Sequence, residues 1–312
     1  MKFEMGVSSS LMYTVTLNMA GHEHIQKIGS KALQLAKLTG QNVKVPGGFV
    51  ITSNALERFL EANGLRTPEL IVDFENRLIE ARLPEDVYHE VAASFESMRG
   101  QSGSEMMAVA VRSSSSAEDL EEASFAGQYE TILNVTDLKH LLNSLKRCWA
   151  SLFSARVRDY AQQKNVSSDM GSFPMGVLVQ QMVQADVSGV IFSMNPVTHN
   201  EDEIIINASY GLGEAIVSGL VTPDSYVIGK TDGHIEKELG LKEVKIVAAD
   251  KGTVELTTTE EEQNRFCLSD EHIAELAEQT HKIEAFYGMP VDIEFAIKDR
   301  HIYILQARPV TT

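Results

Sequence analysis

The sequence contains few of the features that mark secreted and membrane-spanning proteins. Only two of its 312 residues are cysteines, Cys148 and Cys267, which excludes a disulfide framework and is typical of a reducing cytoplasm. No apolar run reaches the length needed to span a membrane. Near the N-terminus, serines at residues 8–10 stand where a signal peptide would have its apolar core. We therefore expect a cytoplasmic protein.

Positive charge is also scarce. Lys and Arg total 27 against 44 Asp and Glu, which gives a formal net charge of −17 at pH 7. This balance argues against nonspecific binding to nucleic acid or to an anionic membrane, so we expect neither as a partner. A few well-placed cations can still hold a nucleotide. The hydrophobic content of 43% is ordinary for a globular protein, and the length leaves room for two lobes.

The pattern of apolar residues predicts helices mainly in the first half of the chain and strands mainly in the second. Helices are predicted over residues 31–38, 53–62, 138–163 and 270–287. For the last of these, Ser269 or Asp270 is the expected cap, and Gly288 is expected to end the helix. Strands are predicted over residues 107–111, 176–182, 189–192 and 204–206. This is an α+β arrangement, and we assign residues 1–176 to an N-terminal lobe and residues 177–312 to a C-terminal lobe.

The C-terminal segment, residues 291–312, has the most informative pattern of polar side chains. Two alternating strands flank a short polar break. One face of the first strand carries Asp292 and Glu294, and one face of the second carries Gln306 and Arg308. A carboxylate and an amide oxygen suit a hard cation such as magnesium, and a guanidinium suits a pair of phosphate oxygens. The alternative is an ordinary terminal hairpin with a surface salt bridge.

The loop between these strands decides whether the polar groups meet. A three-residue loop at residues 299–301 sets Glu294 opposite Gln306 and Asp292 opposite Arg308. A two-residue loop would oppose these side chains to apolar ones, because a one-residue slip brings the other face of the strand into register. We favour the three-residue loop, although such loops prefer a glycine and this one has none.

Residues 111–135 form a second informative segment. A buried strand is predicted to end at Arg112, and four serines, an acidic turn and a loop of small residues follow it. A loop of small residues lets backbone amides approach phosphate oxygens, and an arginine after an apolar strand suits a phosphate clamp. The alternative is a serine-rich linker beside a structural arginine.

Three shorter motifs give weaker signals. Residues 29–31 begin a helix, where backbone amides and Lys31 suit an anion, although a solvated lysine near a helix start has the same pattern. On a predicted strand, Gln180 and Met182 suit the walls of a pocket for a flat aromatic base, or else the glutamine is simply exposed. A lone Gly-x-Gly before Glu214 predicts a tight loop close to a ligand and makes Glu214 a candidate binding residue.

Taken in order, these motifs resemble the N-terminal nucleotide-binding domain of phosphoenolpyruvate synthase, which also occurs in pyruvate phosphate dikinase and rifampin phosphotransferase. The order is Gly-Ser-Lys, VPGGFVIT, VRSSSSAEDLEEASFAGQYETILNV, LVQQMV, SGVIFSMNPVT, GLGEAIVSGLVTPD and DIEFAI…LQARPVT. The resemblance covers nearly the whole chain. It implies an ATP-grasp fold, with ATP bound between two lobes and Mg²⁺ as a cofactor.

The resemblance also implies roles for individual residues. Those that hold phosphates and serve catalysis are Lys31, Arg112 and Arg308, and those that bind magnesium are Glu294 and Gln306. The residues that surround the adenine are Gln180, Gln181, Met182 and Val183. The loop that covers the phosphates, with the residue beside it, contributes Ser124, Gly127, Gln128 and Thr131. The sequence departs from the family pattern with Ser30 in place of a usual glycine and Val291 in place of a frequent glutamine, and neither change removes a charged ligand.

Full-length members of this family continue into a swivelling domain whose Thr-x-His motif carries a phosphorylated histidine, and then into a domain for the acceptor. None of the nine histidines of this chain lies in such a motif. We therefore expect either a truncated piece or one subunit of a split enzyme. Phenylphosphate synthase is similar in having its nucleotide-binding and histidine domains on separate chains.

The leading hypothesis is an ATP-dependent phosphotransferase of the dikinase type. A histidine of the partner domain would attack the β-phosphate of ATP in a pyrophosphoryl step that releases AMP, and a phosphoryl group would then pass from the histidine to a small-molecule acceptor. Catalysis would come mostly from positioning and charge neutralisation by Lys31, Arg112, Arg308 and magnesium. The alternatives are a stand-alone kinase or ligase that acts directly on a small molecule and a non-catalytic ATP sensor.

Overall fold

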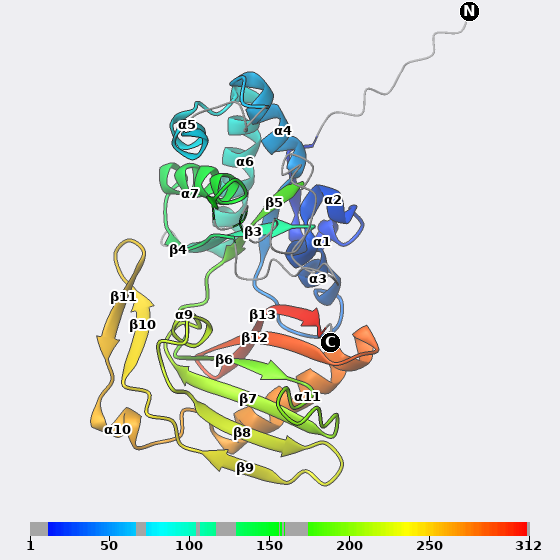
Figure 1. Ribbon diagram of the computed structural model, residues 1–312, viewed down its shortest axis with the longest axis vertical. Coiled ribbons are helices and arrows are strands. Elements are labelled where there is room, and N and C mark those ends of the chain that lie inside the picture. The colour runs from blue at the N-terminus through cyan, green and yellow to red at the C-terminus, as the bar shows by residue number, and fades with distance from the viewer. Residues whose placement is uncertain are drawn as a thin grey trace, which may run out of the picture.

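The computed structural model describes residues 12–66, 73–103, 107–116, 129–155, 157, 159 and 174–310 of the chain. The described elements form two lobes, each built on an antiparallel sheet, and the C-terminal strand lies where the lobes meet (Figure 1). The predicted α+β architecture with two lobes is confirmed. No helix among these described residues combines the length and the apolar character that crossing a membrane requires.

The N-terminal lobe contains a five-stranded sheet in the order β1-β2-β5-β3-β4. Its strands are β1 (Thr14–Thr16), β2 (Gly48–Ile51), β3 (Val109–Ser115), β4 (Thr131–Val135) and β5 (Met175–Gln181). The central strands β3 and β5 are buried along nearly their whole length, because both faces of the sheet are covered. On β5, Val177 and Val179 pack into one core and Leu178 into the other, as alternation along a strand requires.

Helices cover the two faces of this sheet. The larger core contains side chains from α4 (Ser53–Ala62), α5 (Phe74–Glu80), α6 (Glu85–Ser102) and α7 (Leu138–Ser151). The smaller core contains side chains from α1 (Leu17–Ala20), α2 (Ile25–Ile28) and α3 (Ser30–Leu38). In the larger core, Phe59 of α4 lies against Trp149 of α7, with ring centroids 5.1 Å apart. The helix predicted over residues 138–163 is interrupted after Ser151, where three successive amides bond three residues back instead of four. Residues 155, 157 and 159 are helical again, and residues 160–163 lie outside the described residues.

The C-terminal lobe contains a six-stranded sheet in the order β13-β12-β6-β7-β8-β9. Its strands are β6 (Val187–Phe192), β7 (Glu203–Tyr210), β8 (Asp224–Gly229), β9 (Ile235–Glu238), β12 (Val291–Lys298) and β13 (His301–Pro309). Helix α11 (Asp270–Tyr287) packs on this sheet through Ile273, Leu276 and Ile283. The hydroxyl of Ser269 accepts from the amide of His272 at 3.2 Å to begin the helix, and Gly288, with φ +69°, ends it as the sequence predicts.

Three smaller elements complete the C-terminal lobe. They are α9 (Glu214–Val217), α10 (Glu260–Gln263) and a separate hairpin of β10 (Val244–Ala248) and β11 (Thr253–Thr257). The hairpin leaves the C-terminal lobe and its tip lies beside β4 of the N-terminal lobe (Figure 1). It therefore spans the gap between the two sheets at one end.

Two segments join the lobes. Residues 182–186 lead from β5 to β6, so the chain changes sheet after Gln181, whereas the sequence-based boundary falls at 176/177, inside β5. The segment after α3 also reaches across, because Leu38 and Val43 pack in the core of the C-terminal lobe and the carbonyl of Lys44 accepts from the amide of Ile304 at 2.9 Å. These joins bring strands of both sheets around one space.

Candidate functional site

A cavity of about 590 Å³ lies between the two lobes. The N-terminal lobe lines it from α3, β3, β4 and β5, and the C-terminal lobe lines it from α9, β6, β12 and β13. The predicted site residues that line it are Lys31, Arg112, Thr131, Gln180, Gln181, Met182, Val183, Glu214, Glu294, Gln306 and Arg308. Ser124, Gly127 and Gln128 lie outside the described residues. Among the described residues, those predicted to bind phosphate, metal and the base therefore line one cavity.

The polar face of the C-terminal hairpin forms as predicted, but for a different reason. Glu294 pairs with Gln306 and Asp292 pairs with Arg308 across β12 and β13. The predicted three-residue loop is wrong: the turn has two residues, Asp299 and Arg300, with φ values of +49° and +67°. Two successive positive φ values are typical of the two-residue turn that suits the twist of a hairpin.

A β-bulge at Leu305 corrects the register. Phe295 pairs with Ile304 and Glu294 with Gln306, so Leu305 has no partner in the ladder. The extra residue shifts β13 by one position and returns the polar side chains to the face that they would otherwise leave. It also exposes a backbone carbonyl at the cavity, because the oxygen of Leu305 accepts from Arg112 Nη1 at 3.1 Å.

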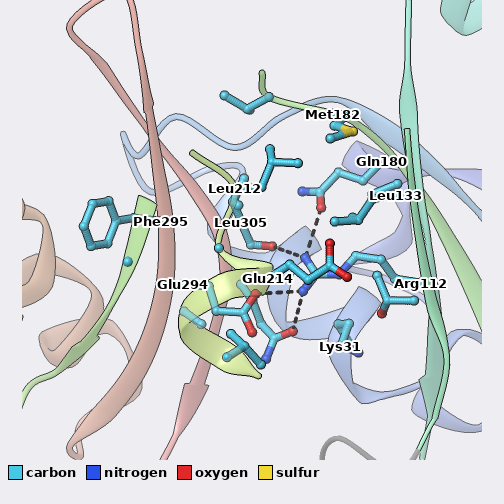
Figure 2. Close-up of a pocket in the computed structure, with 18 of the residues that line it drawn as sticks. Lys31, Arg112, Leu133, Gln180, Met182, Leu212, Glu214, Glu294, Phe295 and Leu305 are labelled. Atoms are coloured by element: carbon cyan, nitrogen blue, oxygen red, sulfur yellow. Dashed lines mark hydrogen bonds and ion pairs between the residues drawn. The ribbon is translucent and has the colours of Figure 1, made fainter. Parts of the chain in front are cut away.

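Arg112 is the centre of the site (Figure 2). Its Nη2 donates to Glu294 Oε2 at 2.8 Å and to Gln306 Oε1 at 3.1 Å, and its Nη1 donates to Gln180 Oε1 at 3.3 Å. The side chain comes from β3 of the N-terminal lobe and is 9% exposed. One guanidinium therefore joins both lobes, and it contacts both side chains that the sequence assigns to a metal.

The strand that carries Arg112 does not end there, as the sequence suggested, but continues to Ser115. The serines that follow serve the fold. Ser113 donates from its hydroxyl to the carbonyl of Glu130 at 2.9 Å, and the hydroxyl of Ser114 accepts from the amide of Ala32 at 3.0 Å. This position in the middle of a buried strand holds the Arg112 side chain in place.

The start of α3 contacts the same strand closely. Gly29 has φ +78°, and a Cβ there would lie 1.9 Å from the carbonyl oxygen of Ser114, so only glycine fits. The amide of Ala32, in the first turn of this helix, bonds to the hydroxyl of Ser114 at 3.0 Å. Lys31 lines the cavity with its side chain, and its Nζ donates to the carbonyl of Ser113 at 3.1 Å.

The surroundings of the two hairpin carboxyls shift their pKa values in opposite directions. Burial alone would raise the pKa of Glu294, but Arg112 and then Lys31 outweigh it and lower that pKa below its usual value. Burial raises the pKa of Asp292, although Arg308 donates to its Oδ2 from Nε at 3.0 Å and from Nη2 at 2.8 Å. Glu294 is therefore the carboxyl whose environment favours the charged form.

The end of the cavity away from Glu294 and Lys31 is apolar, and the side-chain amide of Gln180 is directed into it. Leu133, Met182 and Leu212 form its walls (Figure 2). Gln180 is 2% exposed, and its Nε2 has no hydrogen-bond partner among the described residues. A buried amide donor without a partner is costly unless a ligand accepts its hydrogen bond, which fits a flat heteroaromatic base between apolar walls.

Some site features were not anticipated from the sequence. The carbonyl of Leu305 enters the site through a bulge, which no local pattern announced. Asn134 lies in β4 behind the apolar wall, and its backbone N–H donates to Met182 Sδ at 3.1 Å. An asparagine inside a strand is unfavourable, so its presence in TILNV was a usable signal. Glu214 lines the cavity but is exposed, and its Oε2 accepts from Thr253 Oγ1 at 3.2 Å.

Comparison with known proteins assigns nearly the whole chain to one family. Residues 25–312 match the model of the pyruvate phosphate dikinase AMP/ATP-binding domain. The uncharacterized phosphotransferase YvkC of Bacillus subtilis is 48% identical over 96% of this chain and 35% of its own length. A probable phosphoenolpyruvate synthase of Methanothermobacter thermautotrophicus is 37% identical over 96% of this chain and 46% of its own length.

The rifampicin phosphotransferase of Bacillus cereus is 36% identical over 91% of this chain and 34% of its own length. The chain thus spans less than half the length of each of these three relatives. Among solved structures, a D-alanine–D-alanine ligase from Helicobacter pylori matches with a TM-score of 0.36 and 10% identity, over 89% of this chain and 53% of that one. On the family match and these relatives together, the chain belongs to the family of pyruvate phosphate dikinase AMP/ATP-binding domains.

Proposed function

We propose that this protein binds Mg-ATP in the cavity between its lobes and phosphorylates a histidine on a separate swivelling domain. The observation that carries the proposal is the convergence on Arg112, whose guanidinium contacts Glu294, Gln306 and Gln180 at one point of the cavity. Donors for phosphate, oxygens for a metal and an unpartnered amide for a base therefore lie around one guanidinium. The family match supports adenine nucleotide as the ligand.

The phosphate end of the nucleotide would lie among three cations. Lys31, Arg112 and Arg308 all line the cavity and come from α3, β3 and β13. Phosphoryl transfer requires little covalent chemistry from the protein, so positioning and charge neutralisation supply most of the rate enhancement. Planar guanidinium groups suit paired phosphate oxygens, whereas Lys31 contributes a point charge.

The donor set also fits magnesium. Glu294 offers a carboxylate and Gln306 an amide oxygen, and no cluster of three His, Cys, Asp or Glu ligands is found among the described residues. Magnesium commonly takes one or two protein oxygens and completes its shell with water and phosphate oxygens. When bound, it would neutralise charge on those phosphate oxygens. Arg112 bonds one carboxylate oxygen of Glu294 and the amide oxygen of Gln306, so magnesium and Arg112 would share or exchange these oxygens.

The acceptor for the first transfer is proposed from the family. The nine histidines of the chain include none in a Thr-x-His motif, and the relatives are two to three times longer than the matched region. A histidine on another domain or chain would attack the β-phosphorus, the bond from that phosphorus to the oxygen shared with the α-phosphate would break, and AMP would leave. The histidine would then carry a pyrophosphoryl group, whose γ-phosphate would leave as inorganic phosphate on attack by water. The phosphoryl group that remains on the histidine would pass to a small-molecule acceptor.

Two experiments test this proposal. Calorimetric titration should show binding of Mg-ATP to the wild-type chain and much weaker binding to Arg112→Met. Incubation with labelled ATP should then release AMP only when a histidine domain from a matched relative is added. Rapid release of ADP by the chain alone would favour a stand-alone kinase or ligase instead. Binding without any turnover in the presence of that domain would favour an ATP sensor.

A further inference from the structure

Asn134 occupies an unusual position at the edge of the N-terminal sheet. It is 3% exposed and has φ +56°, a left-handed conformation that asparagine tolerates better than most residues. Val135 pairs with Val109 and Ile132 with Val111, so the intervening Leu133 and Asn134 face a single residue of β3. This is a β-bulge, which turns side chains away from their regular direction and is frequent beside functional sites.

The bulge directs Asn134 to the other lobe. Its side-chain Nδ2 donates to the carbonyl oxygens of Ala249 at 2.6 Å and Gly252 at 2.8 Å. These two residues form the tip of the β10–β11 hairpin, where the amide of Ala249 also donates to the carbonyl of Gly252 at 3.1 Å. Both hydrogens of one amide group are thus used to hold the tip of a hairpin that belongs to the C-terminal lobe.

The same residue is bonded to the wall of the cavity. The backbone amide of Asn134 donates to Met182 Sδ at 3.1 Å. Met182 and Leu133 pack in one apolar cluster with Leu212 and with Ile246 of β10. The amide of Leu212 in turn donates to the carbonyl of Ile246 at 2.8 Å. Asn134, the hairpin and the apolar end of the cavity are therefore one connected unit.

We propose that Asn134 is a positioning residue that sets the base-binding end of the cavity by fixing the β10–β11 hairpin to Met182. This inference rests on the proposed nucleotide function and assigns a specificity role within it. Without the two side-chain bonds, the hairpin is released from the N-terminal lobe, and Ile246 and Leu212 lose their fixed distance from Met182. The phosphate end, formed by Lys31 and its neighbouring cations, does not depend on this contact.

The test compares a ligand with a base and a ligand without one. Asn134→Asp keeps the shape and the backbone preference but loses the donors, and Asn134→Gly keeps the backbone conformation but loses the whole side chain. By calorimetry, both variants should bind Mg-ATP about tenfold more weakly, as expected for two lost neutral hydrogen bonds. Both should bind magnesium tripolyphosphate as the wild type does. Asn143→Asp, at an exposed position on α7, is the matched control and should change neither affinity.

A second variant approaches the contact from the hairpin. Replacing residues 249–252 by Asn-Gly gives a two-residue turn that closes the ladder at its last pair, Ala248 and Thr253. The tip becomes two residues shorter, which withdraws its carbonyl oxygens from Asn134 Nδ2. It should weaken Mg-ATP binding as Asn134→Asp does, and combining the two changes should add nothing further. Additive losses would overturn the inference, because they would show that the two sites act separately.

The outcomes separate the two proposals. If the wild type binds Mg-ATP and the Asn134 variants bind it equally well, the inference is wrong and the proposed function stands. Equal weakening of Mg-ATP and tripolyphosphate also overturns the inference, since it would indicate a general structural role. If the wild type does not bind Mg-ATP, both proposals fail together.

Discussion

Two buried ion pairs of this protein differ in how fully their polar atoms are bonded. Asp224 and Lys242 in the C-terminal lobe are both 0% exposed. Asp224 Oδ1 accepts from Lys242 Nζ and from the amide of Gly240 at 2.8 Å, and its Oδ2 accepts from the amide of Cys267 at 2.8 Å. Lys242 Nζ also donates to the carbonyl of Gly240 at 3.0 Å. This pair is enclosed by bonds to the backbone.

The pair of Arg112 and Glu294 is built differently. It faces the cavity, with side-chain exposures of 10% and 27%, and Arg112 Nε has no hydrogen-bond partner among the described residues. Gln180, which contacts the same guanidinium, also has an unpartnered buried nitrogen. A buried pair enclosed by backbone bonds therefore serves the fold, whereas a pair beside a cavity with unpartnered hydrogen-bonding groups is available to a ligand.

Breaking the pair of Asp224 and Lys242 should lower the free energy of unfolding more than any other change proposed for this protein. Lys242→Met leaves Asp224 charged and buried without its cation, which costs about 3–5 kcal/mol of unfolding free energy. Urea denaturation followed by circular dichroism measures it. The control is Lys237→Met, which removes the ion pair with the exposed Asp270 and should cost about 0–1 kcal/mol. Equal losses for the two variants would contradict the distinction drawn here.

Breaking the pair of Arg112 and Glu294 should weaken nucleotide binding more than it lowers the free energy of unfolding. Arg112→Met removes charge-assisted contacts to phosphate, typically about 1.5–3 kcal/mol each, so the Kd for Mg-ATP should rise roughly 10- to 100-fold or more. The loss of unfolding free energy should be smaller than for Lys242→Met, because Glu294 keeps partial contact with solvent. Calorimetry and urea denaturation on the same preparations give both values. A variant that is as unstable as Lys242→Met but binds Mg-ATP normally would reverse the assignment.

Substitutions of Glu294 and Arg308, on the C-terminal hairpin, should differ in how AMP release responds to magnesium. Glu294→Ala removes a proposed magnesium oxygen, so raised magnesium should partly restore AMP release with a histidine domain present. Arg308→Ala removes a proposed phosphate contact worth about 1.5–3 kcal/mol, and added metal should not restore it, because a hydrated ion does not reproduce a planar guanidinium. Magnesium titrations of both variants measure this. Identical responses to metal would argue against separate roles for the two residues.

The smallest expected effect is a pH dependence. Because the pKa of Glu294 is lowered in the folded state, its contribution to stability is present above its unfolded value and is lost as pH falls through the lowered pKa. Arg112 is the strongest of the groups that lower it. The difference in unfolding free energy between wild type and Arg112→Met should therefore narrow from pH 7 to pH 4. A difference that widens on acidification would contradict the proposed charge state of Glu294.

Local patterns predicted the elements whose signals lie within a few residues. The cap at Ser269, the stop at Gly288 and the alternation along β12 each depend on neighbours in the chain, and each is found where the sequence places it. The polar face of the hairpin was predicted correctly, yet the turn was not. A bulge at Leu305 compensates for the shorter turn, and bulges leave no short-range signature.

The composition and motif order determined by themselves the α+β class, the family and the residue types that meet in the cleft. Only the tertiary structure decided that Arg112 bonds the proposed metal ligands across the lobes and that Asn134 ties a distant hairpin to Met182. The physical reason is the separation in sequence between the residues that interact. Capping and alternation depend on adjacent residues, whereas Arg112 and Glu294 are 182 positions apart and meet only after two sheets have packed.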